Sequence, residues 1–268
     1  MPARVPACWC RWLLAFLLIA EVVAPVAAAD DKKKPDPPKP EPPRLLLSVP
    51  GGVVTGVSYR VALRGLNLTN TLRLWIAETS APVTLTWGKA VPAKVPDKAD
   101  PKKIGDTQID VQLQLPANWV GPTLSILASN AVGSSAPVSL RVASAGVWRA
   151  EKEPNGGFAA PQTLALPAAV PGTIDPAQDV DVYRIQGRAG QWLTVEIFGA
   201  RQGSPLDAIL TLYNERGSVL RAVDDGPAGR DPALKFRLPA DGTYFLGVND
   251  AHDTGGPLHV YWLEVRVD

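Results

Sequence analysis

The sequence predicts an all-β protein, an immunoglobulin-like sandwich followed by a jelly-roll β-sandwich. Apolar side chains recur at every second position in short runs rather than at helical spacing. The 27 prolines, together with glycines and asparagines, separate these runs as turn formers. A chain of 268 residues has room for two domains with separate cores. We expect these domains at residues 45–145 and 146–268.

Residues 1–29 have the pattern of a secretory signal peptide. Two arginines precede an apolar run at 12–20, and the alanines at 27–29 are small residues of the kind signal peptidase cuts after. An uncleaved membrane anchor is the alternative, but Glu21 and Pro25 interrupt the run before it reaches the roughly 20 residues that a span needs. We therefore expect an exported protein, secreted or held in the periplasm or cell envelope, with no membrane span after cleavage.

The positions of the cysteines and the balance of charged residues argue against three features: disulfides, thiolate metal sites and nucleic-acid binding. Cys8 and Cys10 leave with the signal peptide, so the mature chain has neither a disulfide nor a thiolate metal site. Without Arg4, Arg11 and Glu21, the 27 basic and 26 acidic residues become 25 of each. This balance does not suggest a nucleic-acid partner.

Residues 30–44 are expected to be a Pro/Lys-rich linker. The segment reads DDKKKPDPPKPEPPR, which offers no apolar side chain to a core and too many prolines for a helix or a central strand. Binding of a polyanion is the alternative, but the acidic residues among the lysines weaken it.

Residues 45–142 read as about seven short strands, which is typical of an immunoglobulin-like sandwich. Three runs alternate most clearly and mark buried faces. They are Tyr59, Val61, Leu63; Leu72, Leu74, Ile76; and Ile109, Val111, Leu113, Leu115. The insertion at 88–106, rich in lysine and proline, is expected to form a long mobile loop. Contact with an acidic polymer is the alternative role for its lysines.

Turn residues of this half give a first resemblance. They are Pro50 and Gly56, the step Gly65-Leu-Asn67-Leu68, and Asn130-Ala-Val-Gly133. In these features the half resembles the TIG or IPT domains, which have an immunoglobulin-like fold. The residues concerned are turn formers that tolerate positive φ.

Apolar and polar residues alternate more strongly in residues 146–268 than in the first half. The predicted inward positions are Leu193, Val195, Ile197; Ala208, Leu210, Leu212; Tyr244, Leu246, Val248; and Tyr261, Leu263, Val265, Val267. Hairpin turns are expected at 214–217, 224–226 and 241–242, where glycine permits a left-handed backbone. Two packed sheets of a jelly roll would follow from this pattern.

Four short motifs in this half give a second resemblance, running from about residue 151 to the end. They are Glu151-Lys-Glu153-Pro-Asn155, Gly172-Thr-Ile174, Asp179-Val-Asp181-Val-Tyr183 and Asp241-Gly-Thr-Tyr244. Their order resembles the bacterial pre-peptidase C-terminal (PPC) domain, a non-catalytic jelly-roll module related to the calcium-dependent collagen-binding domains of collagenases. The resemblance implies binding rather than catalysis.

The acidic segment at the start of this half carries a metal hypothesis. Glu151, Glu153 and Asn155 are spaced two apart, so in an extended chain their oxygens project from one side. Calcium prefers such carboxylate and amide oxygens. The resemblance implies that Asp179 and Asp181 share the ion, although Gly156 follows Asn155 where relatives have a further polar residue. The alternative is an interdomain hinge without metal.

The residues do not predict an enzyme. The sequence has no Gly-x-Ser-x-Gly, His-Glu-x-x-His or Gly-x-x-x-x-Gly-Lys motif, and His252 and His259 fall in a polar loop and at the start of the last strand. Alternation places Trp192 and Trp262 on the face opposite the inward Leu193 and Leu263, where exposed aromatic rings can grip a ligand; burial under another layer is the alternative. Two functions remain: a binding module for a protein or polysaccharide of the cell surface or matrix, or a structural or assembly component of the envelope without a free ligand.

Overall fold

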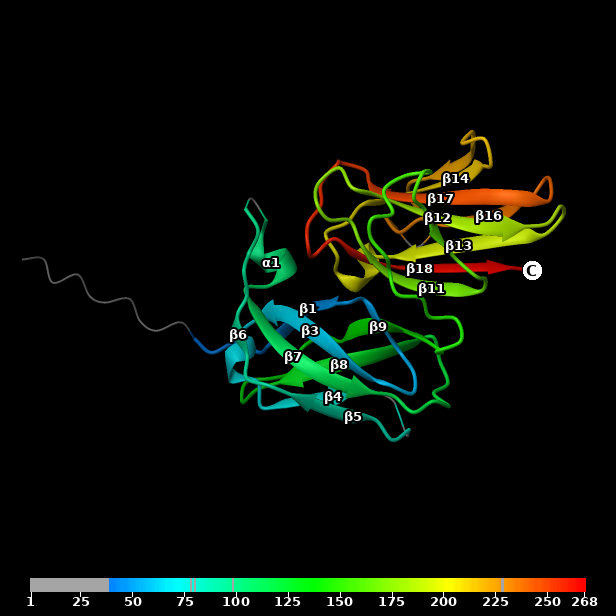
Figure 1. Ribbon diagram of the computed structural model, residues 1–268. Helices are drawn as coiled ribbons and strands as arrows, with labels where there is room; N and C mark the ends of the chain where they lie inside the picture. Colours follow the sequence, from blue (N-terminus) through cyan, green and yellow to red (C-terminus); the bar gives the residue numbers. More distant parts are fainter. Residues whose placement is uncertain (1–38, 78, 80, 98, 228) are drawn as a thin grey trace, which may run out of the picture. The chain divides into compact units, whose positions relative to one another are not determined.

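A computed structural model describes residues 39–268, apart from positions 78, 80, 98 and 228 (Figure 1). The predicted all-β fold is confirmed, since strands in four sheets are almost the only regular secondary structure in this part of the chain. The predicted signal peptide (1–29), and the linker up to residue 38, lie outside the described residues. No helix within the described part is long and apolar enough to cross a membrane.

The first half of the chain supplies two sheets, A and B. Every pair in sheet A is antiparallel, and in sheet B only β2 and β9 run parallel. The order in sheet A is β1 (Arg44–Val49), β3 (Ser58–Leu66), β7 (Thr107–Gln114) and β5 (Thr84–Trp87), with β6 (Val91–Pro92) also on β7. The order in sheet B is β2 (Gly52–Val54), β9 (Val138–Ala143), β8 (Thr123–Ser129) and β4 (Arg73–Ile76). Two short helices interrupt these strands: η1 (Leu68–Asn70) and α1 (Pro101–Ile104).

The second half supplies sheets C and D. All pairs are antiparallel except β10 with β12. The order in sheet C is β11 (Ala168–Thr173), β18 (Val260–Val267), β13 (Trp192–Phe198) and β16 (Ala233–Arg237). The order in sheet D is β10 (Gln162–Thr163), β12 (Val180–Gly187), β17 (Gly242–Asp250), β14 (Ala208–Asn214) and β15 (Val219–Val223), and a single turn, η2 (Ala200–Gln202), follows β13.

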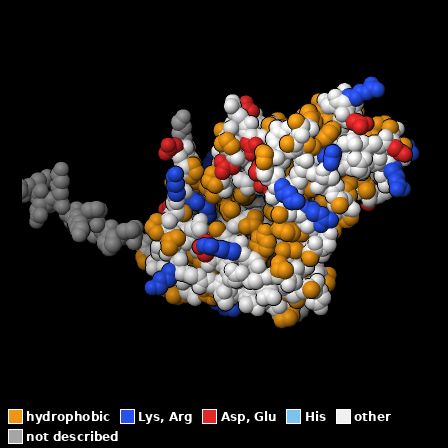
Figure 2. Space-filling model, in the orientation of Figure 1, with side chains coloured by type: hydrophobic (Ala, Val, Ile, Leu, Met, Phe, Trp, Pro, Cys, Tyr) orange, Lys and Arg blue, Asp and Glu red, His pale blue; other side chains and the backbone are white. Residues whose placement is uncertain are grey.

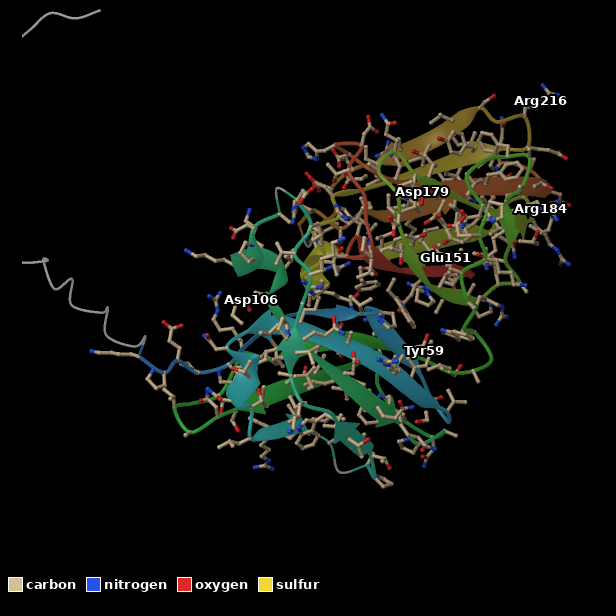
Figure 3. The ribbon with its side chains drawn as sticks, turned by 60° about the vertical axis from the view of Figure 1, so that its left-hand side comes forward. Tyr59, Asp106, Glu151, Asp179, Arg184 and Arg216 are labelled. Atoms are coloured by element: carbon tan, nitrogen blue, oxygen red, sulfur yellow. The ribbon has the colours of Figure 1, made fainter. Side chains whose placement is uncertain are left out.

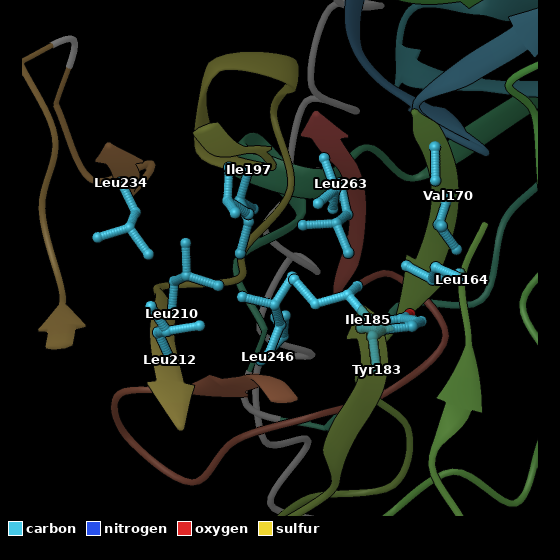
Figure 4. Packing of buried hydrophobic residues seen from close by; sticks show 14 of the residues in the cluster. Leu164, Val170, Tyr183, Ile185, Ile197, Leu210, Leu212, Leu234, Leu246 and Leu263 are labelled. Atoms are coloured by element: carbon cyan, nitrogen blue, oxygen red, sulfur yellow. The ribbon is translucent and has the colours of Figure 1, made fainter. Parts of the chain in front are cut away.

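Alternating side chains of sheets C and D form a shared core (Figure 4). All the predicted inward positions of this half join that cluster, with Val267 at its margin. In sheets A and B the prediction holds for most positions but not for Leu72, which is 70% exposed. Leu72 lies just before β4 begins at Arg73, so the strand alternation does not extend to it.

The insertion at 88–106 is not the free loop that we expected. It contains β6 and α1, and Asp100 caps α1 by accepting a hydrogen bond from the Lys102 amide at 2.9 Å. Ile104 is buried in a small apolar cluster with Leu47. The buried guanidinium of Arg64 donates to three carbonyls of the insertion, those of Lys94, Ile104 and Gly105. Buried apolar and polar contacts therefore tie the insertion to sheet A.

Trp262 is the buried one of the two tryptophans that alternation places on an outer face. It does point away from the core between sheets C and D, but it is fully buried, against Gly52 of β2. A Cβ atom at Gly52 would lie 2.5 Å from the indole ring, so only glycine fits there. The Trp262 indole N–H donates to Glu264 at 3.0 Å, and Glu264 pairs with Arg141 of β9 at 2.6 Å.

Residues Pro40–Asp268 form one compact unit. The predicted boundary near residue 145 falls between β9, the last strand of sheet B, and β10, the first strand of sheet D. The division into domains at 45–145 and 146–268 stays a prediction.

Candidate functional site

The segment from Arg149 to Asn155, between β9 and β10, brings Glu151 and Glu153 beside β12 of sheet D. Glu151 is labelled in Figure 3. The segment is not a strand, and hydrogen bonds from both sheets hold it. The Arg149 amide donates to Ala169 of β11 at 2.9 Å, and the Val182 amide of β12 donates to Asn155 at 3.0 Å. The Gln162 side chain bridges the segment by accepting from the Lys152 amide and donating to the Ala150 carbonyl.

Three carboxylates converge at this segment. Glu151, Glu153 and Asp181 each offer an oxygen within 4.8 Å of the others. Asp181, on β12, is fully buried, and its Oδ1 has no hydrogen-bond partner. Glu151 is partly buried and its Oε1 accepts from the Thr173 amide at 3.2 Å. Three carboxylates in so small a space repel one another unless protons or a cation compensate them.

Two buried tyrosines connect this cluster to the core. The Tyr261 hydroxyl donates to Asp181 Oδ2 at 2.5 Å, and the Tyr183 hydroxyl lies 2.6 Å from that of Tyr261. Tyr183 also donates to Glu151 at 3.4 Å. A Cβ atom at Gly172 would lie 2.4 Å from the Tyr261 hydroxyl oxygen, so glycine there leaves room for the network. The tyrosines fix the orientation of the carboxylates that they contact.

The surroundings make the ionised forms costly. Burial, and to a lesser extent the charge of Glu153, raises the pKa of Glu151 to about 7. Burial and then the charge of Glu151 raise the pKa of Asp181 to about 9. Burial also raises the pKa of Tyr183 and of Tyr261 well above the ordinary value, so both hydroxyls keep their protons. Without a cation the cluster therefore holds protons at neutral pH.

The remaining predicted ligands differ in their placement. Asn155 is fully buried, and neither its amide oxygen nor its amide nitrogen has a hydrogen-bond partner among the described residues. Its backbone amide donates to Glu153 at 3.0 Å, which places it beside the cluster. Asp179 does not join the converging group. Its carboxylate caps a turn by accepting from the amides of Asp175 and Val180.

The donor set suits a hard cation. Three carboxylates and a buried amide are oxygen donors of the kind that calcium takes at about 2.3 to 2.6 Å, in sets of six to eight. The orphaned Asp181 Oδ1 and the unpartnered side chain of Asn155 are buried oxygens of the kind that a metal satisfies. The residues present therefore fit calcium.

A second acidic group, which was not expected, lies at the same end of the strands of sheet D, on the other side of β17 from Asp181. Asp207, Asp224 and Asp225 offer oxygens within 4.8 Å of one another. Two basic groups lie near Asp207: the Arg230 guanidinium at 3.8 Å and the His252 ring at 3.7 Å. Asp224 and Asp225 are exposed. The Arg230 guanidinium and solvent compensate this group, unlike the first.

The described histidines do not form a nucleophile–base pair. His259 Nε2 lies 3.2 Å from the Thr254 hydroxyl, but that hydroxyl donates its single proton to Asp250 at 2.8 Å. Thr254 is exposed, and Asp250 also accepts from three backbone amides, of Asp207, His252 and Thr254. These contacts order the loop after β17.

The cluster should make the calcium-free protein less stable as the pH rises. The folded-state pKa values of Glu151 and Asp181 exceed those of an unfolded chain, so above pH 6.5 the folded state binds more protons. The free energy of unfolding in chelator should therefore fall by about 1 kcal/mol per pH unit between pH 6.5 and 9. Burial lowers the pKa of His259, so this residue adds a slope of opposite sign near pH 6.5, where the unfolded chain is partly protonated, and none above about pH 7.5, where it is neutral in both states.

Denaturant unfolding at several pH values in chelator measures this slope. The same measurement on Asp181→Asn is the control, because the variant has no carboxyl group to titrate there. A free energy of unfolding that stays constant or rises between pH 6.5 and 9 in the unaltered protein would show that the cluster is not protonated in the folded state.

Comparison with known proteins bears on the second half of the chain. Residues 179–250 match the family model of the bacterial pre-peptidase C-terminal domain, which confirms the resemblance found in the motifs. The matched range includes Asp181, whereas Glu151 and Glu153 precede it. A probable subtilase-type serine protease of Deinococcus radiodurans is 31% identical over 105 residues, which cover 34% of this chain. The chain spans only 14% of that relative's length.

Two solved structures resemble parts of the chain. The pre-peptidase C-terminal domain of collagenase from Bacillus anthracis is 16% identical, with a TM-score of 0.33, and covers 39% of this chain and 93% of its own. PliG of Aeromonas hydrophila, a periplasmic inhibitor of g-type lysozyme, is 19% identical, with a TM-score of 0.32, and covers 46% of this chain and 96% of its own.

Proposed function

We propose that the chain is an exported, non-catalytic binding module whose second half is stabilised by calcium. Glu151, Glu153 and Asp181 would hold the ion, with Asn155 supplying an amide oxygen. The observation that carries the metal proposal is the convergence of three carboxylates around a fully buried Asp181 with an orphaned oxygen. Calcium would neutralise their repulsion and join the segment before β10 to β12.

The non-catalytic role is supported by the family match and by the hydrogen bonds of the histidines. Pre-peptidase C-terminal domains are non-catalytic, and residues 179–250 match their model. Within the described residues, His259 and His252 order a loop rather than activate a nucleophile. The proposed target is a protein or polysaccharide of the cell surface or matrix, reached from outside the cytoplasm.

An assembly role is the second candidate, and the sheet edges give it less support. Exposed strand edges pair with other chains when they are long and unprotected. The edge strands of the four described sheets have only two to six residues each. Short edges are one way in which proteins avoid such pairing.

Calcium titration of the purified, chelator-treated chain in a calorimeter tests the metal proposal. We expect one calcium ion to bind per chain. The Glu153→Gln variant should bind calcium with lower affinity, because it removes one negative charge from the cluster at its exposed residue. Magnesium is the ion control, because it requires octahedral geometry and gives up its waters reluctantly. Absence of calcium binding by both calorimetry and equilibrium dialysis would refute the proposal.

A further inference from the structure

The outer face of sheet C carries a second set of polar side chains. Leu193, Val195 and Ile197 point into the core, so Trp192, Thr194 and Glu196 of β13 point outward. By the strand register, Trp192 lies opposite Arg237 of β16, and Thr194 lies between Lys235 of β16 and Arg266 of β18. Glu196 lies opposite Glu264 in the next row, toward Trp262. These residues form rows across three strands.

The two ends of this outer face differ in charge. At the end near Trp262, both glutamates are in ion pairs: Glu264 pairs with Arg141 at 2.6 Å, and Glu196 pairs at 2.9 Å with Arg201, which also contacts Asp231. At the other end, three exposed cations form no ion pair with any described residue. They are Lys235, Arg237 and Arg266. We call these cations and Trp192 the cationic patch.

One acidic residue borders the patch. Asp268 lies opposite Trp192, with backbone hydrogen bonds in both directions at 3.0 and 3.2 Å. The patch therefore keeps a net positive charge, although the full sequence has a net charge of only +1. On the face of the molecule drawn in Figure 2, basic side chains are interspersed with acidic and uncharged ones.

Trp192 gives the patch an apolar element. Its side chain is 44% exposed, and the Lys235 ammonium lies 5.4 Å from the centroid of its ring. A large aromatic group left on the surface beside cations serves ligands that combine a flat apolar face with negative charge. Lys235 stacked on the ring keeps the cation and the indole in one place.

A sugar acid has both features in one unit. Its pyranose ring presents C–H groups that stack on an indole, and its carboxylate pairs with arginine or lysine. A nucleic acid is a poorer fit, because the chain as a whole lacks the excess positive charge that such binding requires. A phospholipid head group supplies charge but no ring face for Trp192.

We propose that the cationic patch binds an acidic polysaccharide of the polyuronate type. This inference deepens the proposed function by naming its ligand class and rests on the chain being a binding module. The patch lies on the opposite sheet from Asp181, on side chains outside the carboxylate cluster. Calcium binding and polysaccharide binding can therefore be tested apart.

Binding of the full chain to immobilised polygalacturonate in calcium-free buffer, against neutral dextran, measures this activity. The triple variant Lys235→Gln, Arg237→Gln, Arg266→Gln should bind at least about tenfold more weakly, a loss of roughly 1.4 kcal/mol. The matched control is Arg184→Gln, Arg216→Gln, Arg221→Gln, which removes three exposed positive charges from sheet D and its hairpin. It should retain binding to within about threefold.

Trp192→Ala separates stacking from simple charge attraction. It keeps all three cations, and we expect it to weaken binding by about five- to tenfold. Four results would overturn the inference: no polygalacturonate binding by the unaltered chain, equal losses in both triple variants, no loss in Trp192→Ala, or equal affinity for anionic phospholipid vesicles. A chain that binds calcium but no polyuronate would overturn this inference alone and leave the metal proposal standing.

Discussion

Replacing Trp262 with alanine should destabilise the protein by about 4 kcal/mol, because it removes the largest fully buried side chain of the described residues and leaves a cavity. The indole contacts Gly52 of sheet B and clusters with Ala143, Ala169 and Phe198, so the cavity would open at the contact between sheets B and C. Its N–H bond to Glu264 is lost as well. For a chain of this size the thermal midpoint should fall by roughly 10 °C.

Trp192→Ala is the matched control for this prediction. It makes the same substitution on the same face of sheet C, on the neighbouring strand, but at a ring that is 44% exposed. We expect a change within about 1 kcal/mol. Calorimetric melting of both variants decides: equal losses would mean that Trp262 does not hold sheets B and C together.

The alternation of apolar side chains along each strand predicted the cores, because it indicates which side of its own sheet a residue faces. The inward positions of β13, β17 and β18 were all predicted correctly for this reason. The same reasoning placed Trp262 on the outer face correctly but left its burial open, since a second layer, contributed by a distant segment, covers that face. Alternation within one strand carries no information about such a layer.

The candidate site was predicted in part. The spacing of Glu151 and Glu153 identified two members of the converging group, and the resemblance supplied Asp181. Asp179 had equal standing in the sequence but caps its own turn, as aspartate side chains often do with nearby backbone amides.

The tyrosine pair was missed, although a signal for it existed. Tyr183 follows Asp181 on β12, and Tyr261 lies at an inward position of β18. A tyrosine predicted to face a core needs a partner for its hydroxyl. Two such residues near an acidic motif favour a shared network, but only the fold shows that β12 and β18 bring them to the same carboxylates.

Replacing Asp181 with asparagine should abolish the response to calcium while changing the calcium-free protein little. Burial and the charge of Glu151 raise the pKa of Asp181 to about 9, so at pH 7.5 without calcium its carboxyl is largely protonated and asparagine is a close neutral replacement. With calcium bound, the carboxylate would be ionised and in contact with the ion, a role that the amide fills poorly. The loss should therefore be confined to the calcium-bound state.

Asp225→Asn is the matched control for this variant, since it makes the same substitution in the second acidic group. Asp225 is exposed, so the variant should keep the full calcium response. A calcium response lost in Asp225→Asn would instead assign the ion to the group around Asp207.

Thermal melting of the unaltered chain and of these two variants, in calcium and in chelator at pH 7.5, tests the calcium-stabilised module most directly. Calcium at a hundred times its dissociation constant adds about 2.7 kcal/mol, so the midpoint of the unaltered chain and of Asp225→Asn should rise by roughly 5 to 10 °C. That of Asp181→Asn should not move. An equal rise in Asp181→Asn, or no rise in the unaltered chain, would contradict a calcium site at Glu151, Glu153 and Asp181.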